Sequence, residues 1–137
     1  MTTAGMSDSS VSSYAVRLTR GNTMHRLIVD GRDVAPVEVA ATSRARSKGL
    51  LGRTGLAGAL WLAPARQVHT FRMQFAIDVA HLAKDGTVLH VATMPPGRLG
   101  RWVWRSRGVL EAESGSFEQW GLVRGGRVQV TSPAAAV

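Results

Sequence analysis

Short β-type runs separated by glycine-containing turns dominate the pattern of apolar and polar positions in this chain. His25 to Val29 and Val34 to Ala41 predict two strands around an Asp30-Gly31 turn, and apolar and polar residues alternate within the second run. An alternation with a period of two is typical of a strand with one buried face. The chain is therefore expected to open with a half-buried hairpin.

A short helix is predicted next, from about Arg44 to Leu51. Thr42 or Ser43 can cap its N-terminus through a hydroxyl oxygen, and Gly52 suits the C′ position just after its end. Basic side chains in the first turn oppose the helix macrodipole. We therefore expect tertiary packing, rather than local sequence, to hold this helix.

Residues 69–91 form the centre of the predicted fold. Asp85-Gly86 lies between two β-rich runs and suits a two-residue type I′ turn, because both turn residues need positive φ, which Gly adopts freely and Asp tolerates. Both faces of this hairpin are largely apolar, which predicts burial in a sandwich or small barrel. The turn sets a register that pairs Lys84 with Thr87, Ala83 with Val88, and His81 with His90.

The remaining elements are short. Proline lacks the amide donor that a strand ladder needs, so the second hairpin strand should end at Pro95-Pro96, and a loop should follow from Gly97 to Gly108. Further strands are predicted at Ala59 to Leu62, Gln67 to Met73, Val109 to Glu113 and Arg127 to Thr131, with a small helix over Phe117 to Trp120 capped by Ser116.

The length of the chain fits one domain, since 137 residues can bury about two-thirds of the surface that the unfolded chain exposes. We expect a disordered N-terminal tail over 1–23, a single domain over 24–131 and a C-terminal tail over 132–137. Met24 directly precedes the first predicted strand. We hypothesise that translation starts there rather than at Met1 or Met6, which N-terminal sequencing would test.

Composition narrows the class of protein. The chain has no cysteine, which excludes disulfides, thiolate metal sites and a cysteine nucleophile. No stretch approaches the ~18 consecutive apolar residues of a membrane span. Residues 1–13 lack the apolar segment of a secretory signal, so we expect a cytoplasmic protein.

Charge is the most unusual global property, because 17 basic residues and 9 acidic ones give a net charge of +8. Such a charge attracts nucleic acid, phosphates or anionic surfaces whatever the fold, although an arginine-rich coding bias is the explanation we prefer. Aromatic and guanidinium groups that could stack on bases and grip phosphates, or form a protein interface, are interleaved in one loop. We call this segment the Arg/Trp loop, and its residues of interest are Arg98, Arg101, Trp102, Trp104, Arg105 and Arg107.

Recognisable catalytic motifs are absent from the sequence: it has no nucleophile elbow and no glycine-rich phosphate loop. Glu111 and Glu113 lie two apart on one strand face, where we expect a solvated or salt-bridged pair. His81 and His90 could share a divalent metal across the hairpin, but the only third donors would be His25 or Asp78, and Asp78 lies on the opposite strand face. We therefore predict neither a metal centre nor a cofactor.

Three blocks of sequence together resemble the DUF192 (UPF0127) family of uncharacterised proteins. The resemblance runs from about Val37 to Val130 and keeps the order and spacing of the family's motifs. Thr42 to Arg53 is similar to the Arg-x-x-Gly-Leu-Met/Leu-Gly-Arg segment. Val68 to Asp78 is similar to the His-Thr-x-x-Met-x-Phe-Pro-Ile-Asp segment, and Gly108 to Glu111, Gly115 and residues 121–128 are similar to the closing Val-Leu-Glu, Gly and Gly-Asp segments.

This chain departs from the family pattern at three positions. Ala76 replaces a usual Pro, Gly126 replaces a common Asp, and His81 stands where the family tends to have an apolar residue. The resemblance implies a mostly β (α+β) fold, a small compact barrel-like or sandwich β assembly with one or two short helices. It implies no particular activity.

The motif blocks contain six polar or unusual residues that we expect to converge beside the hairpin as a ligand-binding site. For two of them, an Asp and an Arg, we prefer the structural alternative of a buried ion pair, which is costly to break from one side. The six residues are Arg53, His69, Thr70, Met73, Asp78 and Glu111.

The sequence supports three functional hypotheses. The leading one is a non-enzymatic binding or accessory module that engages an anionic small molecule, a glycan or a protein segment through the hairpin edge and the Arg/Trp loop. The alternative is a hydrolase in which His69 is the base, oriented by Asp78 or Glu111. The third is nonspecific nucleic-acid binding through the Arg/Trp loop, without a recognised RNA-binding signature.

Overall fold

The computed structural model describes residues 22–131, and they form a mostly β domain around one seven-stranded sheet with the strand order β5-β4-β6-β3-β2-β1-β7. This confirms the expected fold class. The predicted tails lie outside the described residues, except that Asn22 and Thr23 belong to the first strand. In chain order the elements are β1 (Asn22–Val29), β2 (Arg32–Ala40), α2 (Ser43–Lys48), β3 (Ala59–Leu62), β4 (Ile77–Leu82), β5 (Val88–Met94), β6 (Gly108–Glu113), α3 (Ser116–Trp120) and β7 (Val128–Thr131).

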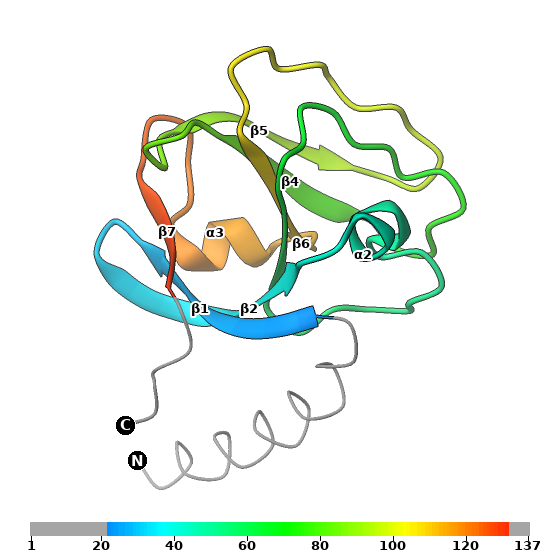
Figure 1. Ribbon diagram of the computed structural model, residues 1–137, viewed down its shortest axis with the longest axis horizontal. Coiled ribbons are helices and arrows are strands. Elements are labelled where there is room, and N and C mark those ends of the chain that lie inside the picture. Colours follow the sequence, from blue (N-terminus) through cyan, green and yellow to red (C-terminus); the bar gives the residue numbers. More distant parts are fainter. Residues whose placement is uncertain (1–21, 132–137) are drawn as a thin grey trace, which may run out of the picture.

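The sheet curls until its two edges approach each other at one end (Figure 1). There, Val88 at the start of β5 donates its N–H to the Gly126 carbonyl, and Val128 at the start of β7 donates to the Gly86 carbonyl, both at 2.9 Å. β2 and β3 pair in parallel across the connection through α2, whereas the other strand pairs are antiparallel. The result is an incomplete barrel, as the two-faced apolar hairpin predicts.

The core has two parts, because alternate residues of β3, β4 and β6 point to opposite faces of the sheet. Ala80 and Leu82 of β4 join a cluster that also contains Phe117 of α3. Ile77 and Val79 join a second cluster with Leu50, after α2. Both faces of these strands are covered, so apolar residues occur at both sets of alternating positions. The polar side chains among them, Asp78, His81 and Glu111, are buried as well.

The two Asp-Gly dipeptides form different turns. Asp30 and Gly31 both have positive φ, 48° and 84°, as a two-residue type I′ hairpin requires. At the second dipeptide only Gly86 has positive φ, and Ala83 donates its N–H to the Thr87 carbonyl across a three-residue loop. A Cβ at residue 86 would collide with the Val128 carbonyl, so the contact with β7 leaves room only for glycine here.

The predicted register of the central hairpin is therefore wrong near its turn. Leu82, not Ala83, pairs with Val88, and an irregularity between His81 and Leu82 restores the predicted pairing of His81 with His90. The extra residue of the longer loop is absorbed by this bulge.

Three further predictions need correction. Residues 67–73 do not form a strand, since Arg72 has a positive φ of 64° and the segment makes only one isolated bridge, between His69 and Leu99. The first helix ends at Gly49 rather than before Gly52, although Thr42 does cap it, accepting the Ala45 N–H at 3.0 Å. Ser116 does not cap α3, whose N-cap residue is Gly115.

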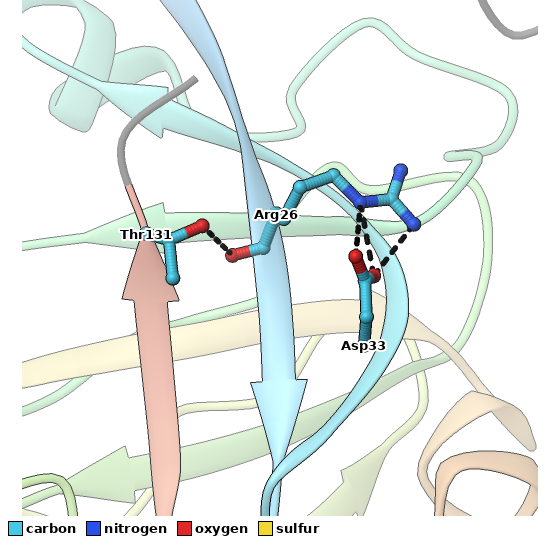
Figure 2. A network of polar contacts seen from close by, with 3 residues as sticks. All are labelled: Arg26, Asp33 and Thr131. Carbon is cyan, nitrogen blue, oxygen red and sulfur yellow. Dashed lines mark hydrogen bonds and ion pairs between the residues drawn. The ribbon is translucent and has the colours of Figure 1, made fainter. Parts of the chain in front are cut away.

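Polar contacts join β2, β1 and β7, which form one end of the strand order. Figure 2 shows the Arg26 guanidinium of β1 bound to the Asp33 carboxylate of β2, with distances of 2.7 to 3.2 Å, while Thr131 of β7 donates its hydroxyl to the Arg26 carbonyl at 3.4 Å. This ion pair is about half exposed, so it stabilises the fold by at most about 1 kcal/mol. No helix within residues 22–131 has the length and hydropathy needed to cross a membrane.

Candidate functional site

A cavity of about 380 Å³ lies between α2, the segment before β4 and the outer face of β3 and β6. We call it the α2 cavity. Arg46 and Lys48 come from α2, His69 and Met73 from residues 67–73, and Glu111 from β6. The structure thus brings together three of the six predicted site residues, His69, Met73 and Glu111, with two cationic side chains.

Glu111 is the residue of the α2 cavity whose pKa is clearly shifted. It shares the outer face of β6 with Val109 of the second core cluster, and only 4% of its surface is exposed. Among residues 22–131, none hydrogen-bonds its carboxyl group. Burial raises the pKa of Glu111 to about 7, and the positive charge of Arg53 offsets part of this rise. Near neutral pH the carboxyl group can therefore either donate or accept a hydrogen bond.

For Glu111 and Glu113 we expected either a solvated or a salt-bridged pair, and the burial of Glu111 excludes the solvated one. Glu113, two residues further on, is exposed and accepts the Leu56 N–H at 2.7 Å. The two carboxyl groups share a strand face but not an environment, because the second core cluster covers only the first of them.

Arg53 forms a structural ion pair, as one of our alternatives predicts, but its acidic partner is Glu38 rather than Asp78. Two parallel hydrogen bonds of 2.9 and 2.8 Å join the guanidinium to the Glu38 carboxylate, which is 1% exposed. Sequence reasoning missed Glu38, since its alternation with valines on β2 predicts a solvent-facing side chain. The sequence did contain one signal for it, because a buried arginine within a family motif needs an acidic partner.

Asp78 lies away from the α2 cavity, on the opposite face of β4 from its neighbour Val79. One carboxylate oxygen accepts the Gly115 and Phe117 N–H groups at 3.0 and 3.1 Å, and the other accepts the Thr93 hydroxyl at 2.8 Å. These bonds satisfy the N-terminal amides of α3. Asp78 is therefore committed to holding α3 and is not placed to orient His69.

Thr70 and His69 are neighbours with different surroundings. Thr70 is fully buried, and its hydroxyl donates to the Pro95 carbonyl at 2.7 Å and accepts the Arg98 N–H at 2.8 Å. His69 is exposed at the cavity, with its ring stacked on Phe71 at 4.8 Å. Its Nδ1 accepts the Phe71 N–H at 3.2 Å, so in this arrangement Nε2 carries the ring proton.

The Arg/Trp loop divides into two parts. Arg98 and Arg101 line a second cavity, against His81 and His90. Trp102 and Trp104 are 52% and 72% exposed.

Arg66 lies over the Trp104 ring, 5.7 Å from its centroid, so one stacking face of this residue is already covered by the chain itself. Arg105 and Arg107 are exposed and lie outside the second cavity, so the structure does not unite the six loop residues in one surface site.

Two solved structures share this fold. One is a protein of unknown function from Novosphingobium aromaticivorans DSM 12444, with a TM-score of 0.66 and 22% identity over 77% of this chain and 84% of the other. The second comes from Sinorhizobium meliloti 1021 and is described as a "putative transcription regulator", with a TM-score of 0.62 and 19% identity over 80% of this chain and 95% of the other. At these identities the likeness concerns the fold alone.

Sequence comparison is more specific about the family. No protein with a curated description matches the chain significantly. The family model DUF192, described as "Uncharacterized ACR", matches residues 25–130, which is nearly the whole described domain and contains every residue of the α2 cavity. The chain therefore belongs to the DUF192 family.

Proposed function

We propose that this protein is a non-enzymatic binding module whose α2 cavity takes a small anionic ligand. The observation that carries the proposal is the convergence of Arg46, Lys48 and His69 around a buried carboxyl group, Glu111, in one cavity of about 380 Å³. Ligand cavities of proteins commonly start near this size and combine apolar walls with a few polar groups. Leu50, Leu62 and Met73 belong to the apolar part of this wall.

The protonation of Glu111 decides how an anion would be held. An ionised carboxylate would repel the ligand, whereas a protonated one can donate a hydrogen bond to it. Because burial already raises the pKa of Glu111 to about 7, protonation costs little at neutral pH. An anion would raise this pKa further, so binding takes up a proton and strengthens as the pH falls through 7.

Calorimetric titration at pH 6 and pH 8 tests the proposal, with sulfate and benzenesulfonate as probes, since neither titrates in this range. We expect roughly tenfold weaker binding at pH 8 than at pH 6. Glu111→Gln should remove most of this difference, whereas the matched change Glu118→Gln, at an exposed residue of α3, should not.

The cationic rim is tested with paired variants of α2. Arg46→Ala should weaken sulfate binding about three- to tenfold, because a charge-assisted contact is lost. Arg44→Ala removes the same charge from the same helix at a residue that does not line the cavity and should have little effect. Equal losses of affinity in the two variants would contradict the anion proposal. So would a heat of binding with neutral glucose and none with sulfate, and that result would favour a module that binds glycans.

The same residues favour a hydrolase as the second candidate. A carboxyl group with a pKa of about 7 suits general acid–base catalysis near neutral pH, and His69 lines the same cavity. Screening p-nitrophenyl esters and glycosides would reveal such an activity. It would have to fall by about 10²-fold or more in Glu111→Gln and stay unchanged in Asp78→Asn, provided that the latter folds.

A further inference from the structure

A second cavity, of about 290 Å³, lies beside the central hairpin, and we call it the hairpin cavity. It lies open to solvent between the outer face of β4 and β5 and the loop that follows β5. None of its lining residues lines the α2 cavity. Met94 and Leu99 contribute apolar surface, while His81, His90, Arg98 and Arg101 contribute polar groups.

His81 is an unusual residue for a buried strand position. Only 1% of its surface is exposed, and neither ring nitrogen has a partner in hydrogen-bond geometry among the residues that the structure describes. An unpaired buried polar group costs about 1–3 kcal/mol, so it calls for an explanation. The position of the ring in the wall of a cavity suggests that its partner is a ligand.

The local charge favours an anion over a cation. The pKa of His81 is lowered to about 4, mainly by burial and then by the charges of His90 and Arg101. The nearby Arg66 carbonyl opposes this shift. Burial and the charges of Arg101 and Arg124 also lower the pKa of His90. Both imidazoles are therefore neutral at pH 7 in a positive field, and each can donate one N–H.

A metal ion fits this site poorly. The described part of the chain contains no group of three or more His, Cys, Asp or Glu residues able to hold a metal. His81 and His90 lie close, with ring centroids 5.7 Å apart, but two neutral ligands beside an arginine do not make a stable cation site.

We propose that the hairpin cavity binds a small organic carboxylate with a short apolar body, its carboxylate held by Arg101 and the His81 N–H and its body packed on Met94 and Leu99. Inorganic anions would leave the apolar surface unused. This site is independent of the α2 cavity and of its proposed function, because the two share no residue.

Calorimetric titration of the full-length protein with butyrate tests the proposal, with butyramide as the uncharged isostere. We expect saturable butyrate binding that Arg101→Gln weakens about tenfold or more, since a charge-assisted contact is lost. The matched variant Arg105→Gln, in the same loop but outside the cavity, should stay within about twofold of the wild-type affinity. Any butyrate that binds in the α2 cavity is recognised by its dependence on Arg46, because Arg46→Ala should remove it and leave the Arg101-dependent binding in place.

The role of His81 is tested directly by NMR of the ring nitrogens. Butyrate should shift the His81 resonances in the wild-type protein and to a much smaller extent in Arg101→Gln. His81→Leu, an apolar substitution of the kind that the family favours, should weaken binding about tenfold. If this variant does not fold, the NMR titration decides the role of His81 without it.

Several outcomes would overturn the proposal. They are no butyrate binding, equal binding of butyramide, equal losses in Arg101→Gln and Arg105→Gln, or zinc binding that depends on both His81 and His90. Tighter binding of inorganic phosphate than of butyrate, dependent on Arg101, would overturn the assigned ligand class. Loss of sulfate binding at the α2 cavity would leave the hairpin cavity unaffected, so the two proposals fail separately.

Discussion

Replacement of Glu111 by Gln should change the pH dependence of folding stability by an amount that follows from burial. The carboxyl group has a pKa of about 7 in the folded protein and about 4.5 when exposed. Between these values the folded state holds a proton that the unfolded state has released, so stability falls as the pH rises. At about 1.4 kcal/mol per pH unit, the wild-type protein loses about 3 kcal/mol by pH 7, and the loss stays constant above it.

His81 affects the pH dependence of folding stability in the opposite direction. Burial lowers its pKa from 6.5 to about 4, so between these values the folded state binds fewer protons than the unfolded state. Its contribution to stability therefore rises with pH over nearly the same window in which that of Glu111 falls. The wild-type stability should change little between pH 4.5 and 6.5, which makes the difference between wild type and variant the informative quantity.

Urea unfolding of both proteins from pH 4.5 to pH 8, followed by tryptophan fluorescence, measures this difference. The free energy of unfolding of Glu111→Gln relative to wild type should rise by about 3 kcal/mol across the range, whatever its value at pH 4.5. Glu118→Gln, at an exposed position, should give a flat difference. A difference for Glu111→Gln that is flat within about 0.5 kcal/mol would refute the assignment of a raised pKa to this group.

Two structural predictions and one functional prediction remain. Glu38→Gln should destabilise the fold by about 2 kcal/mol in urea unfolding, because the mostly buried Arg53 guanidinium then faces an uncharged amide instead of a carboxylate. Asp33→Asn breaks the exposed ion pair with Arg26 and serves as the control, and an equally small loss in both variants would contradict the prediction. Asp78→Ala should cost about 3 kcal/mol and expose the α3 amides to hydrogen exchange, since three hydrogen bonds are lost; unchanged exchange at Phe117 would argue against it. Nucleic acid bound through Trp102 and the loop arginines should dissociate steeply with salt, and affinity that is equal at 50 and about 200 mM salt would exclude this hypothesis.

The sequence by itself determined most of the strand positions and the family. Glycine-containing turns and apolar runs located the opening hairpin, β3, the core of β4 and β5, β6 and β7, because these signals act over a few residues. The order and spacing of the motif blocks identified the family and led to His69, Met73 and Glu111, three of the residues that line the α2 cavity. We predicted that these residues lie together because the family motifs contain them, and not from a geometric argument.

Only the tertiary structure decided the environment of each polar group. Glu38 and Glu111 sit on strands whose outer faces are covered by the second core cluster, and no local pattern announces that cover. The loop at Gly86 is selected by its contact with β7, more than forty residues away, and Asp78 finds its partners in α3. Long-range packing therefore determined whether each carboxyl group of the motifs is a structural partner or a candidate ligand-binding group, since burial and pairing depend on which segments meet.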